Sequence, residues 1–302
     1  MKSIASFIML GGRQATIIVA TMAILSLILP PIVILSTAAV CLVTLRNGLV
    51  AGIQVIVAST VATALLGYLL LGTPMVALSY LLILWLPGLL GAYVLRQSRQ
   101  LAKALEAFIV LGMLAVVGIY IFVDNPAQQW INALQMGVDV ISQQQELPVT
   151  KEDLEQAILF WSNYMTGAVV AGSVMGLTLS LFLARWWQGM LYNPGGFYDE
   201  FKAISLLKRD GVVFVALLLI ATLMTGDIAE IAWNLNIQIL MLFVIIGTSV
   251  VHVVVKNRSN NKYLLFGIYV VLFLVPHLIV PIVVIGLSDV WMSWRERFAV
   301  KA

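Results

Sequence analysis

Long apolar runs recur along the whole of this 302-residue chain, and they constrain its fold more than any other feature. A helix that crosses a membrane needs about 20 mainly apolar residues. Charged residues make up only 10% of the chain, against about 25% in an ordinary soluble domain. The runs cover 14–29, 31–45, 49–72, 75–95, 104–123, 158–184, 210–226, 229–255 and 263–288. The sequence therefore predicts an all-α, polytopic transmembrane helical bundle of about 8–10 spans, with residues 1–302 forming a single membrane domain.

Basic residues fall in the short segments between these runs, where they indicate which ends face the cytoplasm. The clusters are Lys2 with Arg13, Arg46, Arg96 with Arg99 and Lys103, Arg185 through Arg209, Lys256 with Arg258 and Lys262, and Arg295 with Arg297 and Lys301. If all of them are cytoplasmic, neighbouring clusters enclose even numbers of crossings. This predicts hairpins over 14–45, 49–95, 104–184 and 210–255, with both termini in the cytoplasm.

Proline interrupts the first and the last apolar run, and interior proline breaks helical hydrogen bonding. Pro30-Pro31 predicts a bend in the first run. Pro276 and Pro281 predict that 263–288 forms two short legs that meet near His277. The alternative is one kinked helix, which would put the C-terminus outside. Short Pro-interrupted segments at both ends could mark a binding site between broken helices.

The one long hydrophilic segment, 124–157, carries six acidic residues against the single Lys151, as an extracytoplasmic loop would. Apolar residues at helical spacing predict an amphipathic helix on the outer surface. These residues are Trp130, Ile131, Leu134, Val138 and Ile141. Thr150, with acidic residues in the turn that follows, predicts the N-cap of the helix that enters the membrane near Ile158. The segment either covers an outward-facing cavity or only connects two spans.

The sequence ARWWQGMLYNPGGFYDEF, residues 184–201, places six aromatic rings around an Asn-Pro-Gly-Gly turn. Trp and Tyr favour the membrane interface, and Lys202, Lys208 and Arg209 follow. We therefore expect 185–209 to be a cytoplasmic interfacial segment. After the turn, an apolar stripe predicts an amphipathic helix in the membrane plane. The stripe consists of Phe197, Phe201, Ile204 and Leu207.

An interfacial helix of this kind either anchors the bundle or docks a protein partner, and the sequence leaves both open. The residues that would dock a cytoplasmic or membrane partner are Arg185, Trp186, Trp187, Tyr192, Phe197 and Phe201.

The sequence lacks the motifs of disulfide-bonded, metal-binding, nucleotide-binding and hydrolytic proteins. The single Cys41 cannot form an intrachain disulfide, and no Cys/His cluster indicates a metal. The chain contains no GxxxxGK[ST] phosphate loop, no HExxH and no GxSxG. The basic residues orient the spans, so they do not indicate a nucleic-acid partner. We expect no cofactor and no enzyme activity, although Asp227, Glu230 and His252 could in principle transfer protons.

Polar residues inside apolar spans are costly, so they are functional candidates. The span 229–255 holds the richest set. Glu230, Asn234 and Gln238 are four residues apart, and the same helical face continues to Ser249 and His252. This face predicts the binding site of a small polar or amphipathic solute. The alternative is hydrogen bonding between helices, and the sequence favours neither.

The segment Leu45-Arg46-Asn47-Gly48 and three longer stretches resemble the YybS-like family of uncharacterised bacterial membrane proteins. The longer stretches are the segment ARWWQGMLYNPGGFYDEF, the span end GTSVVHVVVKN and the closing GLSDVWMSWRERF with Gly286, Asp289 and Arg295. The resemblance implies a multi-pass protein of the bacterial cytoplasmic (inner) membrane without an established reaction. A more distant likeness, at the level of the fold, is to the substrate-binding membrane subunits of energy-coupling-factor transporters.

Three classes of function follow from these observations. The first is a solute-binding, transport-related membrane subunit without its own ATPase, supported by the polar face and the Pro-interrupted ends. The second is a membrane scaffold or regulatory partner for a cytoplasmic protein, supported by 185–209. The third is a membrane-embedded enzyme. All three place the chain in contact with the lipid bilayer.

Overall fold

The protein is described by a computed structural model that covers residues 1–142, 150–205, 208–258 and 262–297. Within these ranges the chain forms helices and turns and no strand, which confirms the predicted all-α class. Six helical stretches in the described ranges are long and apolar enough to cross a membrane. They are Pro30–Asn47, Leu49–Leu71, Met75–Ser98, Leu101–Phe122, Lys151–Tyr192 and Asp227–Lys256. Shorter apolar helices supply further legs, so the chain is a multi-pass membrane bundle.

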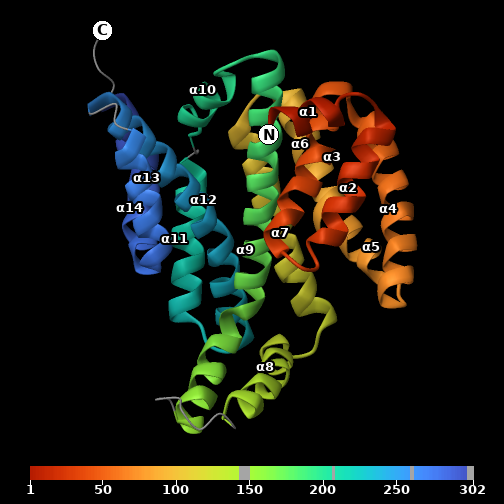
Figure 1. The fold of residues 1–302 in the computed structure, drawn as a ribbon. Helices are drawn as coiled ribbons and strands as arrows, with labels where there is room; N and C mark the ends of the chain where they lie inside the picture. Colours follow the sequence, from red (N-terminus) through yellow and green to blue (C-terminus); the bar gives the residue numbers. More distant parts are fainter. Residues whose placement is uncertain (143–149, 206–207, 259–261, 298–302) are drawn as a thin grey trace.

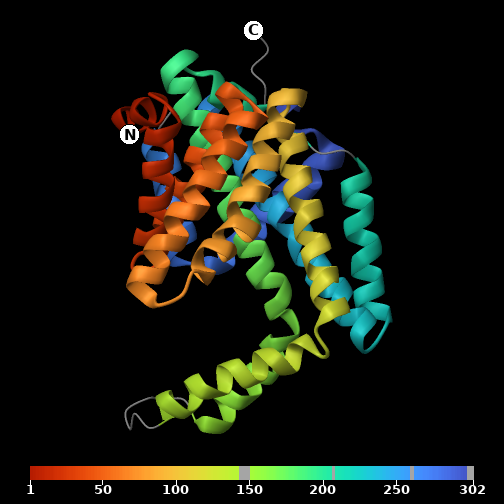
Figure 2. The ribbon, with the colours of Figure 1, turned by 90° about the vertical axis from the view of Figure 1, so that its right-hand side faces the viewer.

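The long helix α9 (Lys151–Tyr192) runs through the middle of the bundle, as Figures 1 and 2 show. To one side lie α1 (Lys2–Ile8), α2 (Gly12–Leu25), α3 (Val33–Asn47), α4 (Leu49–Leu71), α5 (Met75–Tyr80) and α6 (Leu86–Ser98). To the other side lie α11 (Lys208–Leu223), α12 (Asp227–Arg258), α13 (Lys262–Leu274) and α14 (Ile279–Met292). The helix α7 (Leu101–Phe122) contacts α6, α9 and α12, and so joins the two sides.

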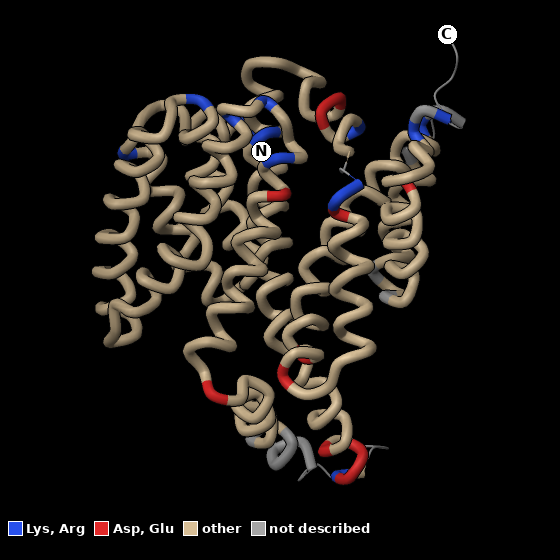
Figure 3. Tube along the Cα trace, turned by 180° about the vertical axis from the view of Figure 1, so that it is seen from behind, with Lys and Arg blue, Asp and Glu red and all other residues tan. Residues whose placement is uncertain are grey.

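The two ends of the bundle differ in charge. Lys and Arg gather at the end that holds the N-terminus and the short helix α10 (Gly196–Lys202), and Figure 3 shows mainly Asp and Glu at the opposite end. We call the first the basic end and the second the acidic end. The predicted cytoplasmic segments thus lie at one end, and the helix predicted outside lies at the other. By the positive-inside rule we expect the basic end to face the cytoplasm.

Both Pro-interrupted runs form hairpins. In the first, a turn and the short 3-10 helix Pro30–Ile32 join α2 to α3. In the last, the 3-10 helix Pro276–Leu278 joins α13 to α14, which returns along α12. The helix α15 (Trp294–Arg297) then ends next to Lys202, at the basic end. The predicted pair of short legs near His277 is therefore confirmed, and the single kinked helix is not what the structure shows.

A π-helical turn, Leu81–Trp85, joins α5 to α6 just before Pro87. Proline has no N–H group to continue the regular hydrogen-bond pattern, so the helix must adjust here. The fully buried Trp85 donates from Nε1 to Ser36 Oγ (3.1 Å), and Ser36 donates to the Val19 carbonyl (2.8 Å). This relay fixes α2 and α3 against the π-helical turn inside an apolar core.

The predicted outer helix is α8 (Pro126–Ser142), which packs on the first turns of α9 and projects beyond the bundle (Figure 2). Trp130 donates to Thr166 Oγ1 on α9 (2.9 Å). The side chains of Val138 and Ile141 lie outside the described residues. Thr150 and Asp153 form a reciprocal capping box at the start of α9, as their spacing predicts.

Candidate functional site: an apolar pocket at the basic end

The polar face of α12 lies against α9 over its first turns. Asn234 is fully buried, and its Oδ1 accepts a hydrogen bond from the backbone N–H of Gly167 (2.5 Å). Its Nδ2 donates to the carbonyl of Asn163 (2.6 Å) and to the hydroxyl of Tyr120 (3.1 Å). A Cβ atom at position 167 would lie 2.8 Å from Asn234, so only glycine permits this approach. The amide therefore ties α12 to α9 and α7.

Two neighbours on this face make similar contacts. Gln238, also fully buried, donates to the carbonyl of Gly167 (2.8 Å). Glu230 accepts a hydrogen bond from the hydroxyl of Tyr120 (2.5 Å). The sequence left two interpretations of this face open, a solute-binding site and hydrogen bonding between helices. For Glu230, Asn234 and Gln238 the structure shows hydrogen bonding between helices.

The other two residues of the face lie nearer the basic end. Ser249 donates to the carbonyl of Phe201 (2.8 Å) and so holds α10 against α12. His252 Nε2 lies 2.5 Å from the hydroxyl of Tyr269 on α13. The five candidate residues thus do not converge on one cavity, and His252 is the one that lines the pocket described next.

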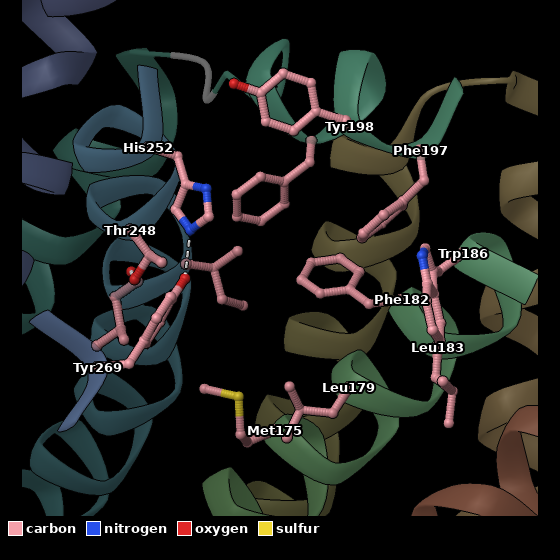
Figure 4. A pocket seen from close by; sticks show the side chains of 13 residues that line it. Met175, Leu179, Phe182, Leu183, Trp186, Phe197, Tyr198, Thr248, His252 and Tyr269 are labelled. Atoms are coloured by element: carbon pink, nitrogen blue, oxygen red, sulfur yellow. Dashed lines mark hydrogen bonds between the residues drawn. The ribbon is translucent and has the colours of Figure 1, made fainter. Parts of the chain in front are cut away.

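An apolar pocket of about 500 Å³ lies between α9, α10, α12 and α13 (Figure 4). Its lining residues are Met175, Leu179, Phe182, Leu183, Trp186, Phe197, Tyr198, Phe201, Val244, Ile245, Thr248, His252 and Tyr269. The α9 residues recur at helical spacing, so one face of this helix forms a continuous wall. The volume and the apolar lining are typical of a small-molecule site.

The turn after α9 folds α10 over this wall. Gly195 has φ +89°, a left-handed conformation that favours glycine. The turn brings Phe197 and Phe201 onto Phe182 of α9, with ring centroids 5.6 and 5.7 Å from that of Phe182. The two α10 rings lie 6.1 Å from each other. Phe182 and Phe197 lie on one side of the pocket, opposite His252 and Tyr269 (Figure 4). Phe201 lies between the two sides, because its ring centroid is also 5.4 Å from that of His252.

The polar atoms of the pocket are few. The His252–Tyr269 pair lies on one wall, and Thr248 is satisfied within α12 by the Val244 carbonyl (2.7 Å). Among the described residues, the buried hydroxyl of Tyr198 has no hydrogen-bond partner. The ammonium groups of Lys202 and Lys256 lie 4.5 and 4.1 Å from the centroid of the Tyr198 ring. The pocket therefore joins an apolar interior to a positively charged edge.

The C-terminal segment fixes the position of α10. Arg295 forms an ion pair with the nearly buried Asp289 and donates to the carbonyls of Lys202 (3.1 Å) and Ile204. The backbone N–H of Trp294 donates to Asp289 Oδ1 (2.8 Å). The closing Gly-x-x-Asp motif and its downstream Arg thus bind the C-terminal hairpin to the helix that covers the pocket.

The six predicted docking residues do not form one surface. Trp186, Phe197 and Phe201 line the pocket. Trp187 is fully buried, and so it is not available to a partner. Leu207 of the predicted stripe lies outside the described residues.

The remaining two docking residues already have partners within the chain. Arg185 binds both carboxylate oxygens of Glu200 and also donates to Gln188 (2.8 Å). The guanidinium of Arg46 lies 4.1 Å from the ring centroid of Tyr192. The first contact ties α10 to α9, and the second ties the end of α9 to α3, so both would serve an anchoring role.

The sequence did not indicate that His252 and the aromatic residues of 197–201 share a pocket. The sequence placed both groups near the cytoplasmic interface, and this shared depth was the one signal that could have connected them. No sequence signal indicated Tyr269, because its place beside His252 depends on how the C-terminal hairpin packs. Among the described residues no group of three His, Cys, Asp or Glu side chains is arranged to hold a metal ion.

Comparison with known proteins identifies the family. Residues 17–290 match the model of the family described as Predicted membrane protein (DUF2232), so the chain belongs to that family. Neither the curated proteins nor the solved structures gave a match. The expected membership of an uncharacterised membrane-protein family is confirmed. The likeness to energy-coupling-factor subunits is not shown by these comparisons.

Proposed function

We propose that this member of the DUF2232 family binds an amphipathic small molecule in the pocket between α9, α10, α12 and α13. In this proposal it serves as the solute-binding membrane subunit of a transport system in a bacterial cytoplasmic membrane. The observation that carries the proposal is the pocket itself, about 500 Å³ in volume and almost wholly apolar, with the His252–Tyr269 pair on one wall. Such a cavity is the usual form of a small-molecule site.

The lining indicates the chemistry of the solute. Burial of each methylene group contributes about 0.8 kcal/mol, and the rings of Phe182, Phe197 and Phe201 offer a surface for a flat or aliphatic body. One hydrogen-bonding group on the solute would meet His252 and Tyr269. The ammonium group of Lys256 at the edge favours a solute with an anionic group, whereas that of Lys202 is paired with Asp199 (2.9 Å).

A passive role in transport rests on the sequence. The chain contains no GxxxxGK[ST] loop to bind the phosphates of ATP, so we assign energy supply to another protein. We assign no catalytic step to the pocket.

A scaffold for a cytoplasmic protein is the second candidate. Trp186 and Tyr192 are 41% and 44% exposed close to the basic end, which a partner could cover. In this candidate the chain needs no bound small molecule, so the two candidates differ in what the pocket holds.

Native mass spectrometry of the gently extracted protein tests the proposal. Leu179, half-exposed in the pocket wall, is changed to Trp to fill the cavity, and Leu219, 53% exposed on α11, is changed to Trp as the matched control. We expect a small-molecule adduct on the native protein and on Leu219→Trp but not on Leu179→Trp. An adduct that persists in Leu179→Trp would refute the pocket as the binding site.

A further inference from the structure

A second cavity lies at the same end of the bundle but among different helices. It has a volume of about 730 Å³ and is formed by the end of α1, the start of α2, the end of α3 and the start of α4. Its lining residues are Ile8, Gly11, Gly12, Arg13, Thr16, Ile17, Val43, Asn47, Ala51, Gln54, Val55 and Ala58. We propose that this cavity binds one anionic phospholipid.

Four polar side chains of the cavity are without partners. Arg13, Thr16, Asn47 and Gln54 make no side-chain hydrogen bond or ion pair with any other residue that the structure describes. They come from three different helices and line one cavity. Their donors, a guanidinium, two amides and a hydroxyl, match the phosphate and ester oxygens of a lipid headgroup.

The depth of Gln54 points to a lipid. Gln54 is the sixth residue of α4, roughly 8 Å below the start of that helix at about 1.5 Å per residue. Its neighbours Val50, Ile53 and Val57 are 69%, 43% and 59% exposed, so this part of α4 faces hydrocarbon. An exposed amide at this depth needs a hydrogen-bond partner, which acyl chains do not offer. The ester carbonyls of a phospholipid lie at the boundary between headgroup and chains.

The positive charge of Arg13 favours anionic over zwitterionic phospholipids in this cavity. Arg13 is cationic, and none of the lining residues is acidic. A zwitterionic phospholipid also carries an ammonium group, for which the cavity supplies no carboxylate. A phospholipid with a net negative charge leaves no such group unpaired, so it is favoured.

The apolar part of the cavity accommodates an acyl chain. Ile17 directly follows Thr16 on α2, and Val55 and Ala58 lie one and four residues beyond Gln54 on α4, in the direction away from the basic end. Ala51 and Ala58 are small residues on one face of α4, which leaves room between the helices. A free phosphate ion would bind Arg13 but would not contact this apolar wall. The wall therefore favours a phospholipid over inorganic phosphate.

Lipid titration of the full-length detergent-solubilised protein, followed by native mass spectrometry, tests this proposal. The probes are dioleoyl-phosphatidylglycerol, dioleoyl-phosphatidylcholine and inorganic phosphate. We expect the native protein to bind phosphatidylglycerol more tightly than phosphatidylcholine, by about fivefold, the effect of one cationic side chain on an anionic lipid. We expect Arg13→Gln to lose this preference and Gln54→Leu to weaken the binding of both lipids.

The matched control is Arg99→Gln, at an exposed arginine of the same end that does not line this cavity. It should keep the preference, and all variants should keep the thermal stability in lipid-free detergent. Equal binding of the two lipids by the native protein, or an unchanged preference in Arg13→Gln, would overturn the proposal. Inorganic phosphate that displaces phosphatidylglycerol at equal concentration would also overturn it, because the acyl chain would then add nothing.

Discussion

Gly247 of α12 and Gly286 of α14 lie directly against each other's helices, with no side chain between the two backbones. A Cβ atom on Gly286 would lie 2.0 Å from the carbonyl oxygen of Phe243 and 2.8 Å from the nitrogen of Gly247. A Cβ atom on Gly247 would lie 1.9 Å from the carbonyl oxygen of Ile282. Small residues allow this close packing of membrane helices. The contact holds the C-terminal hairpin against α12.

Gly286→Ala should therefore destabilise the protein. The added methyl group meets backbone rather than a flexible side chain, so α14 must move, and overpacking of this kind costs about 1–3 kcal/mol. Thermal unfolding in detergent measures the effect. Gly267→Ala in α13 is the matched control, because a Cβ atom there has no neighbour within 4 Å. Equal melting temperatures for the two variants would show that the contact is not as close as described.

Asn234→Ala should lower thermal stability without changing the affinity of the pocket for its solute. The substitution leaves the buried N–H of Gly167 without its acceptor, which costs about 1–3 kcal/mol. Asn236→Leu provides the comparison, because Asn236 is also buried in α12 but its amide has no partner among the described residues. We expect that change to be neutral or stabilising. A loss of solute binding in a stable Asn234→Ala protein would restore the predicted binding role of this face.

Asp289→Asn should destabilise the fold and weaken binding in the pocket. The side chains of Asp289 and Arg295 are 6% and 13% exposed, and removing one charge from a buried pair costs about 3–5 kcal/mol. Because Arg295 also binds the carbonyls that follow α10, the roof of the pocket should loosen. Lys151→Gln breaks an exposed pair with Glu155 and should cost less than about 1 kcal/mol. Thermal unfolding compares the two variants, and equal effects would contradict the account.

Cysteine labelling tests the orientation in the membrane. In a Cys41→Ser background, a cysteine at Arg297 should react only after the membrane is made permeable. A cysteine at Gln128, exposed on α8, should react with an impermeant reagent in intact cells. External labelling at position 297 would contradict the positive-inside assignment of the basic end.

The order of the helical segments was predictable because two local signals agree. Apolar runs give the spans, and basic residues at alternate ends give their direction. Proline then marks both hairpins, including the turn near His277. Apolar run length, flanking basic residues and proline each act on the local segment of the chain, so their effect does not depend on how the helices pack.

The candidate site was only partly predictable because it depends on packing. Helical periodicity showed correctly that Asn234 and Gln238 share one face, and this face is buried. Periodicity does not say what covers a face, and here Gly167 of α9 covers it. The pocket arises where α10 folds back over α9 and α13 returns to α12. That arrangement brings together residues far apart in the sequence, such as Phe182 and Tyr269.

Photocrosslinking with an amphipathic probe tests the central claim most directly. A diazirine-bearing fatty acid has the apolar body and the anionic group that the pocket would accept. After irradiation of the protein in membranes, mass spectrometry locates the crosslinked peptides. We expect crosslinks at Met175, Leu179, Phe201 and Tyr269, and their loss in Leu179→Trp but not in Leu219→Trp. Labelling spread evenly over the lipid-facing helices, and unchanged by Leu179→Trp, would contradict a solute-binding pocket.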